Sequence, residues 1–200
     1  MSTRRDVLKA AAAAVPLSFL PLSPADAERA SEFAAAALEQ AQKSGAPYTP
    51  KFYKADEWKE LRILVDLIIP KDAKSGSATD AGVPEFMDWL ANDHPASYQW
   101  SRDALRWVDG FAYNSFGHNF VKCTVAQRHE LLDQIAWPKK AKPAAAEGVT
   151  FFNRMRDFTA SGFYSSRMGV ADIGYIGNVA RPGWHGCPKP ALDHLGASYS

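Results

Sequence analysis

Few side chains in this sequence have the types and spacing that covalent or redox chemistry needs. The 200 residues include two cysteines, Cys123 and Cys187, which are too few for an all-cysteine iron–sulfur cluster and lack the Cys-x-x-Cys-His pattern that attaches haem. No Gly-x-Gly-x-x-Gly dinucleotide fingerprint, Gly-x-Ser-x-Gly elbow or His-Glu-x-x-His pair occurs. We therefore expect no catalytic residue, no metal site and no cofactor bound by this chain itself.

The two cysteines leave three interpretations open. In an oxidising compartment Cys123 and Cys187 would form a disulfide, and this is the interpretation that we favour. The second is a metal site that adds His129 and His185 to the cysteines, although Cys-x5-His and His-x-Cys are not the close pairs of structural zinc sites. The third is a pair of buried thiols.

His118 is the histidine with the most suggestive surroundings, because it follows aromatic and amide side chains in the segment 113–119. A histidine near the C-terminal end of a helix commonly serves as a cap or a partner of the helix dipole. We expect this structural role for His118 rather than that of a general base. The carboxylates have no spacing that brings two of them together, so acid–base catalysis has no identifiable centre.

Glycines alternate with large aromatic side chains between residues 172 and 188. Glycine and proline disfavour the interior of helices and strands, so this stretch predicts an ordered loop that needs a wall to fold against. Tyr175 and Trp184 are amphipathic anchors, and Asn178 tolerates positive φ. The loop is either a structural lid over a helical core or a binding region, since long ordered loops are often functional.

The N-terminus has the three regions of an export signal. Arg4 and Arg5 precede an apolar, alanine-rich run, and Ala25-Asp26-Ala27 is a small-x-small motif that predicts cleavage between Ala27 and Glu28. The run is too short and too weakly apolar for a convincing transmembrane helix. We expect twin-arginine export to the periplasm, with an uncleaved anchor and an amphipathic N-terminal helix as the alternatives.

The remaining chain has helical periodicity and no convincing alternation of period two, which predicts an all-α fold with a single compact helical domain. Residues 28–44 are a first helix or a partly ordered linker. Further helices are expected at 56–69, from Pro84 to about 90, from Pro95 to about 115, after the capping box of Thr124 and Gln127, and at 151–164. We divide the chain into a signal (1–27), an N-terminal helix or linker (28–54) and a helical domain (55–200).

The balance of acidic and basic residues argues against nucleic acid and anionic membranes as direct partners. Twenty-three basic and 22 acidic residues leave a formal net charge of +1, which gives no electrostatic footprint for nucleic acid or for an anionic membrane surface. We therefore expect association with a membrane only through a complex.

Several motifs together resemble the gluconate 2-dehydrogenase subunit 3 family, the small subunits of flavin-dependent sugar and sugar-acid dehydrogenases. They are the twin arginines, Leu67-Ile68-Ile69-Pro70, Gly82-Val83-Pro84, Gly162-Phe163-Tyr164-Ser165, and Asp172-x-Gly-Tyr-x-Gly-Asn before Gly183-Trp184. The resemblance implies a non-catalytic small subunit that binds a large FAD-dependent subunit of the glucose-methanol-choline type. The large subunit would oxidise the sugar and pass electrons to a cytochrome c, and it would leave the cytoplasm attached to the small subunit.

The ending His185-Gly186-Cys187-Pro188 departs from gluconate-type members and looks more like small subunits of enzymes that oxidise glucose or glycosides, including at carbon 3. Two other hypotheses stay open. One is a stand-alone periplasmic binding or scaffold protein, and the other is a small metalloenzyme that uses His118, His129, His185 and the cysteines. For the subunit hypothesis, the expected interface residues are Tyr113, His118, Tyr175, Asn178, Trp184 and His185.

Overall fold

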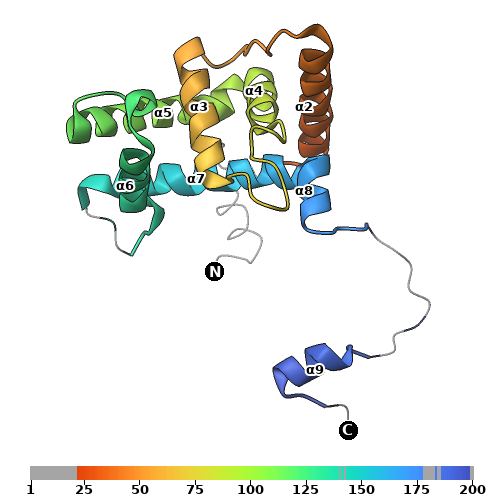
Figure 1. The fold of residues 1–200 in the computed structure, drawn as a ribbon. Coiled ribbons are helices and arrows are strands. Elements are labelled where there is room, and N and C mark those ends of the chain that lie inside the picture. The colour runs from red at the N-terminus through yellow and green to blue at the C-terminus, as the bar shows by residue number, and fades with distance from the viewer. Residues whose placement is uncertain (1–21, 140, 142, 178–182, 184–185, 199–200) are drawn as a thin grey trace, which may run out of the picture.

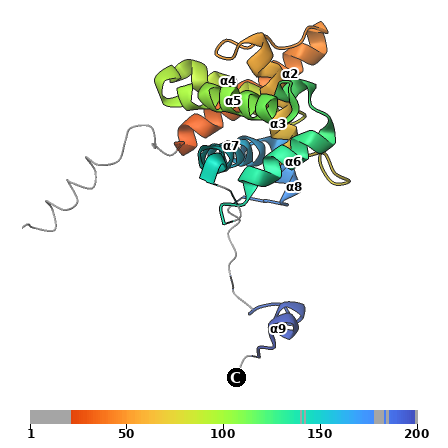
Figure 2. The same ribbon diagram turned by 90° about the vertical axis from the view of Figure 1, so that its left-hand side faces the viewer.

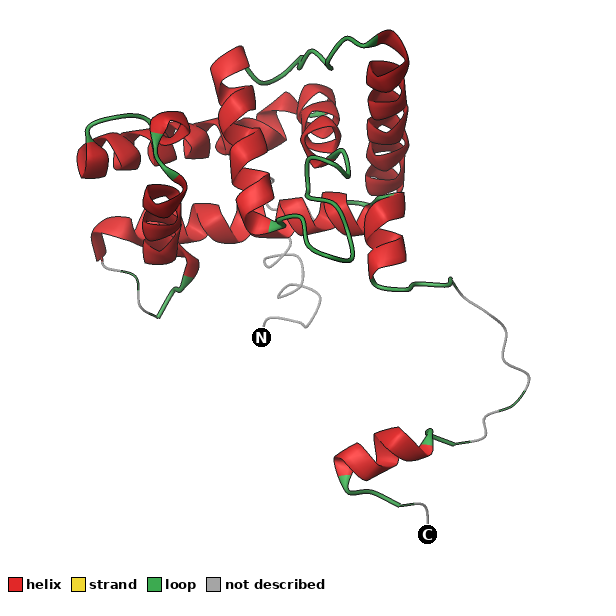
Figure 3. Ribbon diagram, in the orientation of Figure 1, coloured by secondary structure: helices red, strands yellow, loops and turns green. Residues whose placement is uncertain are grey.

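The computed structural model describes residues 22–139, 141, 143–177, 183 and 186–198 (Figure 1, Figure 3). These residues form eight α-helices and no strand, which confirms the predicted all-α fold class. In the described ranges no helix is both long enough and apolar enough to cross a bilayer.

The elements are named in chain order with the labels of Figure 1. They are α2 (Pro24–Ser44), α3 (Ala55–Ile68), α4 (Val83–Asp93), α5 (Pro95–Phe116), the 3₁₀ turn η2 (Phe120–Lys122), α6 (Val125–Ala136), the 3₁₀ turn η3 (Pro143–Ala145), α7 (Ala146–Ser165), α8 (Arg167–Asp172) and α9 (Lys189–Leu195).

The helix boundaries lie where local sequence signals put them. The capping box before α6 is formed, because Thr124 Oγ1 accepts from the Gln127 amide at 3.3 Å and Gln127 Oε1 accepts from the Thr124 amide at 2.9 Å. Prolines occupy the first turns of α4 and α5, where a missing amide donor costs no helical hydrogen bond. The predicted helices from 56, 84, 95 and 124 are therefore confirmed.

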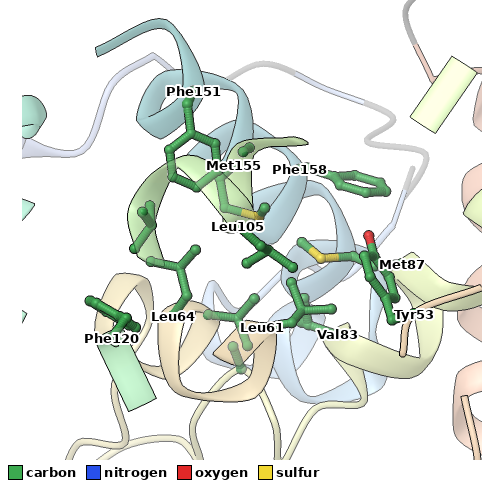
Figure 4. Close-up of a cluster of buried hydrophobic side chains, with 14 of the residues drawn as sticks. Tyr53, Leu61, Leu64, Val83, Met87, Leu105, Phe120, Phe151, Met155 and Phe158 are labelled. Carbon is green, nitrogen blue, oxygen red and sulfur yellow. The ribbon is translucent and has the colours of Figure 1, made fainter. Parts of the chain in front are cut away.

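Helix α7 is the element that contacts most of the other helices. It contacts α2, α3, α4, α5, α6 and α8, and it runs along the lower side of the bundle in Figure 1. Met155 in the middle of α7 is fully buried, as are Leu61 of α3 and Leu105 of α5. Figure 4 shows these three side chains close to Val83 and Met87 of α4. Each such side chain contributes about 1.5–3 kcal/mol by leaving water, so this cluster is the main source of stability.

Of the two expectations for residues 28–44, the structure has the helix. Helix α2 begins at Pro24, ends at the left-handed Gly45, and packs against α4 and α7. Ala30 and Ala34 are buried at this contact, and Gly82 approaches Leu38 so closely that a Cβ would lie 3.1 Å from Leu38 Cδ1. Small side chains at these positions let the helices lie close together.

One buried carboxylate fixes the extended segment between α2 and α3. Asp88 of α4 is inaccessible to solvent and accepts hydrogen bonds from the Tyr48 hydroxyl (2.8 Å) and from the amides of Lys51 (2.8 Å), Phe52 (2.9 Å) and Tyr53 (3.2 Å). Both carboxylate oxygens are thus satisfied, as a buried charge requires. Burial and the bond to Asp88 together raise the pKa of Tyr48.

Two short helices that the sequence did not predict flank the glycine-rich stretch of residues 172–188, whose described residues between them are not helical. Helix α8 precedes the glycine-rich stretch and α9 follows it, and Figures 1 and 2 show α9 apart from the bundle. No residue of α9 is buried. In the glycine-rich stretch Gly174, Gly177 and Gly186 have φ of 64°, 76° and 87°. These are left-handed conformations that glycine adopts without the steric cost of a Cβ.

Candidate partner interface

The turn between α7 and α8 brings the C-terminal stretch onto the helical bundle. Ser166 caps α8, since its Oγ accepts from the Gly169 amide at 3.1 Å and donates to the Phe163 carbonyl at 2.6 Å. At Gly169 a Cβ would overlap the Phe163 carbonyl oxygen and would lie 2.8 Å from the Tyr164 Cα. Only glycine therefore allows α8 to fold back so tightly on the end of α7.

A second contact holds the end of α8 from the other side. Lys74, in the loop between α3 and α4, donates to the backbone carbonyl of Asp172, and its Nζ lies 3.4 Å from the carboxylate of the same residue. The Lys74 amide in turn donates to Asp72 Oδ1 at 2.7 Å. Hydrogen bonds from the backbone amides of Ser75 and Lys74 lower the pKa of Asp72. The loop between α3 and α4 and the end of α8, about 100 residues apart in sequence, are thereby joined at this corner.

Large apolar side chains remain in water at this corner. Ile173, Tyr175 and Ile176 are 57%, 57% and 71% exposed, and Tyr164 at the end of α7 is 45% exposed. The Tyr175 amide donates to the Val170 carbonyl at 3.1 Å, so the chain leaves α8 through a left-handed turn at Gly174. We call Tyr164, Ile173, Tyr175 and Ile176 the α8 patch.

The other expected interface residues do not join the α8 patch. Tyr113, 64% exposed, lies near the end of α5, and His118 follows the left-handed Gly117 that ends this helix. His118 Nε2 lies 3.4 Å from Gln127 Oε1, the same oxygen that caps the N-terminus of α6, so this contact is with the cap of α6 and not with the C-terminal end of α5. Figure 1 shows α6 and α8 at opposite ends of α7. The remaining expected residues, Asn178, Trp184 and His185, lie outside the described part of the chain, as do Arg4 and Arg5.

Sequence reasoning selected the aromatic Tyr175 and missed Ile173, Ile176 and Tyr164. The available signal was the glycine on each side of the Tyr175-Ile176 pair, which keeps the segment from forming a helix that could bury these side chains. Val125 and Trp137 at the two ends of α6 are also exposed apolar residues that the sequence analysis did not single out.

The structure contains no disulfide between Cys123 and Cys187, so the predicted disulfide is not observed. Cys123 is 4% exposed, its Sγ donates to the Asn119 carbonyl at 3.6 Å, and burial raises the pKa of its thiol. Cys187 is half-buried in the separate segment that precedes α9. In the described residues no three His, Cys, Asp or Glu side chains are close enough to hold a metal ion, and His185 lies outside them.

A groove of about 750 Å³ lies between α2, the turn at residues 80–81 and α8. Carboxylates dominate its polar side chains, with Glu28, Glu32, Glu39 and Asp80 facing it together with Arg167. The pyrophosphate of a dinucleotide would meet these negative charges at short range, which is unfavourable. The lining therefore does not suit FAD or another anionic cofactor.

Two further carboxyl groups are buried in the bundle. Glu60 of α3 is 3% exposed, its Oε1 has no hydrogen-bond partner among the described residues, and burial with the nearby Asp109 and Glu57 raises its pKa to about 9. Burial also raises the pKa of Glu85, whose Oε1 lies 3.5 Å from Arg62 Nη1. Both groups lie on core-facing positions of their helices, where they affect stability.

Comparison with known proteins gives a match to one family and none to an individual protein. No curated protein and no solved structure matches the chain. The family model for gluconate 2-dehydrogenase subunit 3 matches residues 55–183, from the start of α3 to just beyond the α8 patch. Members of this family are small subunits of multi-subunit dehydrogenase complexes. The match covers more than half of the chain, and the chain belongs to the gluconate 2-dehydrogenase subunit 3 family.

Proposed function

We propose that this chain is the non-catalytic small subunit of a flavin-dependent sugar or glycoside dehydrogenase. It binds a large FAD-containing subunit of the glucose-methanol-choline type and carries it through twin-arginine export into the periplasm. The large subunit oxidises the sugar and passes electrons to a cytochrome c. The observation that carries this proposal is the family match over residues 55–183.

The α8 patch supports a docking role. Tyrosine and isoleucine side chains that are more than half exposed stabilise a protein only when another surface covers them. Interfaces between permanently associated subunits are rich in such aromatic and apolar anchors. The corner that presents them is held by the Ser166 cap and by Lys74, so a partner would meet a pre-formed turn.

The way in which the chain uses its polar residues supports a non-catalytic role. Asp88 is fully occupied by backbone and tyrosine donors, His118 is bonded to a capping glutamine, and Glu60 is enclosed in the core. These groups are engaged in holding the fold and are not arranged around a shared reacting position.

Affinity purification of the tagged chain from its native host tests the proposal. We expect a large subunit to co-purify and the sample to show a flavin absorption spectrum. A colourless monomer that binds a small molecule would contradict the proposal and favour a binding protein. A colourless monomer with stoichiometric metal and its own activity would instead favour a metalloenzyme.

The export role has a separate test in the same strain. Replacing Arg4 and Arg5 by lysine keeps both charges but removes the paired guanidinium groups, which lysine does not mimic. We expect this variant to leave both subunits in the cytoplasm, whereas the control Lys9→Arg leaves both in the periplasm. Export of the large subunit that is unaffected by the double substitution would contradict the proposal that this chain carries it.

A further inference from the structure

The bond between Ala27 and Glu28, at which the sequence predicts removal of the signal, lies inside a helix. Ser23 caps α2, since its Oγ accepts from the Asp26 amide at 3.1 Å and donates to Asp26 Oδ2 at 2.6 Å. The Ala27 amide donates to the Ser23 carbonyl at 2.9 Å. With Pro24 in the first turn, residues 23–28 thus have the features of a regular helix start and not of an extended segment.

This first turn is also attached to the rest of the domain. Leu22 and Ala27 pack against the hydrophobic core, and Ala30, one turn later, is fully buried. Ser31 Oγ donates to the Ser165 carbonyl at the end of α7 at 2.7 Å, across 134 positions of the sequence. Freeing the Ala27–Glu28 bond therefore requires loss of the Ser23 cap and of packed apolar contacts, in addition to one helical turn.

Cleavage by a signal peptidase requires a conformation that Ala25 and Ala27 do not have in the folded domain. A peptidase acts on exposed segments that can adopt an extended conformation, and the small side chains of Ala25 and Ala27 would have to enter its pockets. In the folded domain Ala25 is exposed but Ala27 faces the core. Twin-arginine export carries folded proteins, so the peptidase would meet this bond only after α2 has formed.

We propose that the folded domain protects the Ala27–Glu28 bond, so that the exported protein keeps residues 1–27. This inference rests on the proposed export. Cleavage would also leave α2 poorly started, because the new α-amino group of Glu28 would bring a positive charge to a helix N-terminus, where the macrodipole is already positive. The retained first turn instead keeps the Ser23 cap and the carboxylate of Asp26 at that position.

Digestion of the purified full-length protein by signal peptidase in detergent tests the protection without any export step. A synthetic peptide of residues 15–35, too short to include the core, serves as the unfolded substrate, and the products are identified by intact mass. We expect the folded protein to be cleaved at least about tenfold more slowly than the peptide, the effect of one lost helix cap. Equal rates, or a peptide that resists cleavage, would overturn the proposal.

Proline variants show whether α2 is the protecting element. Ser31→Pro clashes with the Ala27 carbonyl and breaks the helix beside the bond, whereas Gln40→Pro breaks the same helix far from it. We expect faster cleavage only for Ser31→Pro, and similar rates for both variants would overturn the proposal. If Ser31→Pro does not fold, the wild-type protein is digested below and above its melting temperature instead. We then expect cleavage only above the melting temperature, and equal cleavage at both temperatures would overturn the proposal.

The mass of the chain in cell fractions separates this inference from the proposed export. A full-length chain on the periplasmic side supports both. A periplasmic chain that begins at Glu28 overturns the protection and leaves export standing. A full-length chain confined to the cytoplasm overturns the proposed export and, with it, the retained signal on an exported protein.

Discussion

At the scale of single residues, Glu60 makes stability depend on pH. Its folded-state pKa of about 9 lies above the value of 4.5 for an unhindered glutamate. The stabilisation is therefore complete below pH 4.5 and is lost as the pH rises towards 9, because the unfolded chain releases the proton first. In this window the free energy of unfolding falls by about 1.4 kcal/mol per pH unit.

Glu60→Gln removes this part of the pH dependence, since an amide keeps the shape of the neutral acid and does not ionise. We expect the variant to be more stable than the wild type at pH 8 and similar to it at pH 5, as measured by urea denaturation at both values. Glu130→Gln on the exposed side of α6 is the control. Parallel curves for wild type and Glu60→Gln would show that Glu60 is not buried as a neutral acid.

Asp88 is a residue whose two acceptor oxygens the fold requires. In Asp88→Asn the amide group would face two hydrogen-bond donors in either orientation, which leaves buried donors without acceptors. We expect a loss of about 2–4 kcal/mol in the free energy of unfolding, and about 1 kcal/mol for Tyr48→Phe, which removes one bond. Thermal denaturation measures both, and a loss no greater than that of the surface control Asp133→Asn would contradict the assigned role.

At the scale of elements, the sharp turn from α7 into α8 depends on a missing side chain. Gly169→Ala would place a methyl group on the Phe163 backbone, which is not free to move away. We expect a destabilisation of about 1–3 kcal/mol from this overpacking. The matched control is Gly110→Ala in α5, where the added methyl meets nothing within 4 Å and is expected to stabilise the helix by about 0.5–1 kcal/mol. If both substitutions changed the free energy of unfolding in the same direction, the close contact at Gly169 would not explain the effect of Gly169→Ala.

The elements that the sequence predicted well are those with a long periodic apolar face. Helix α3 has Leu61, Leu64 and Val65 at helical spacing, and all three are buried. Helices α8 and α9 were missed because six and seven residues are too few for periodicity to appear. The alanine-rich α2 was left undecided, since alanine suits a helix and a linker alike until Ala30 and Ala34 are seen to fill a contact.

The candidate interface was predicted less well, because exposure depends on distant parts of the chain. Tyr175 could be selected from its type and its glycine neighbours. The pairing of Lys74 with Asp172, which holds the corner, joins residues that no local pattern connects. The separation of Tyr113 and His118 from Tyr175 is set by the length of α7, and it becomes visible only when the helices are assembled.

At the scale of the whole molecule, apolar contact and not charge is the natural basis of docking. The chain has almost equal numbers of acidic and basic residues, so long-range steering of a partner is weak. The exposed side chains of the α8 patch instead lose water when they are covered. We therefore expect the complex with the large subunit to remain associated at high salt. Size-exclusion chromatography in about 50 mM and about 1 M salt measures this, because at about 1 M salt interactions between surface charges are screened beyond about 3 Å.

The two ends of α7 offer a direct comparison of docking surfaces. Ile176→Asp places a charge in the α8 patch, and Val125→Asp places the same charge on a 61% exposed valine at the start of α6. A central apolar anchor typically contributes more than about 1 kcal/mol to the free energy of binding. We therefore expect Ile176→Asp to reduce co-purification of the large subunit about tenfold or more. Val125→Asp is expected to leave co-purification unchanged. Both variants should keep the wild-type helical content by circular dichroism, because neither side chain is buried. Loss of the partner only with Val125→Asp would move the interface to the end of the molecule that carries Tyr113 and His118.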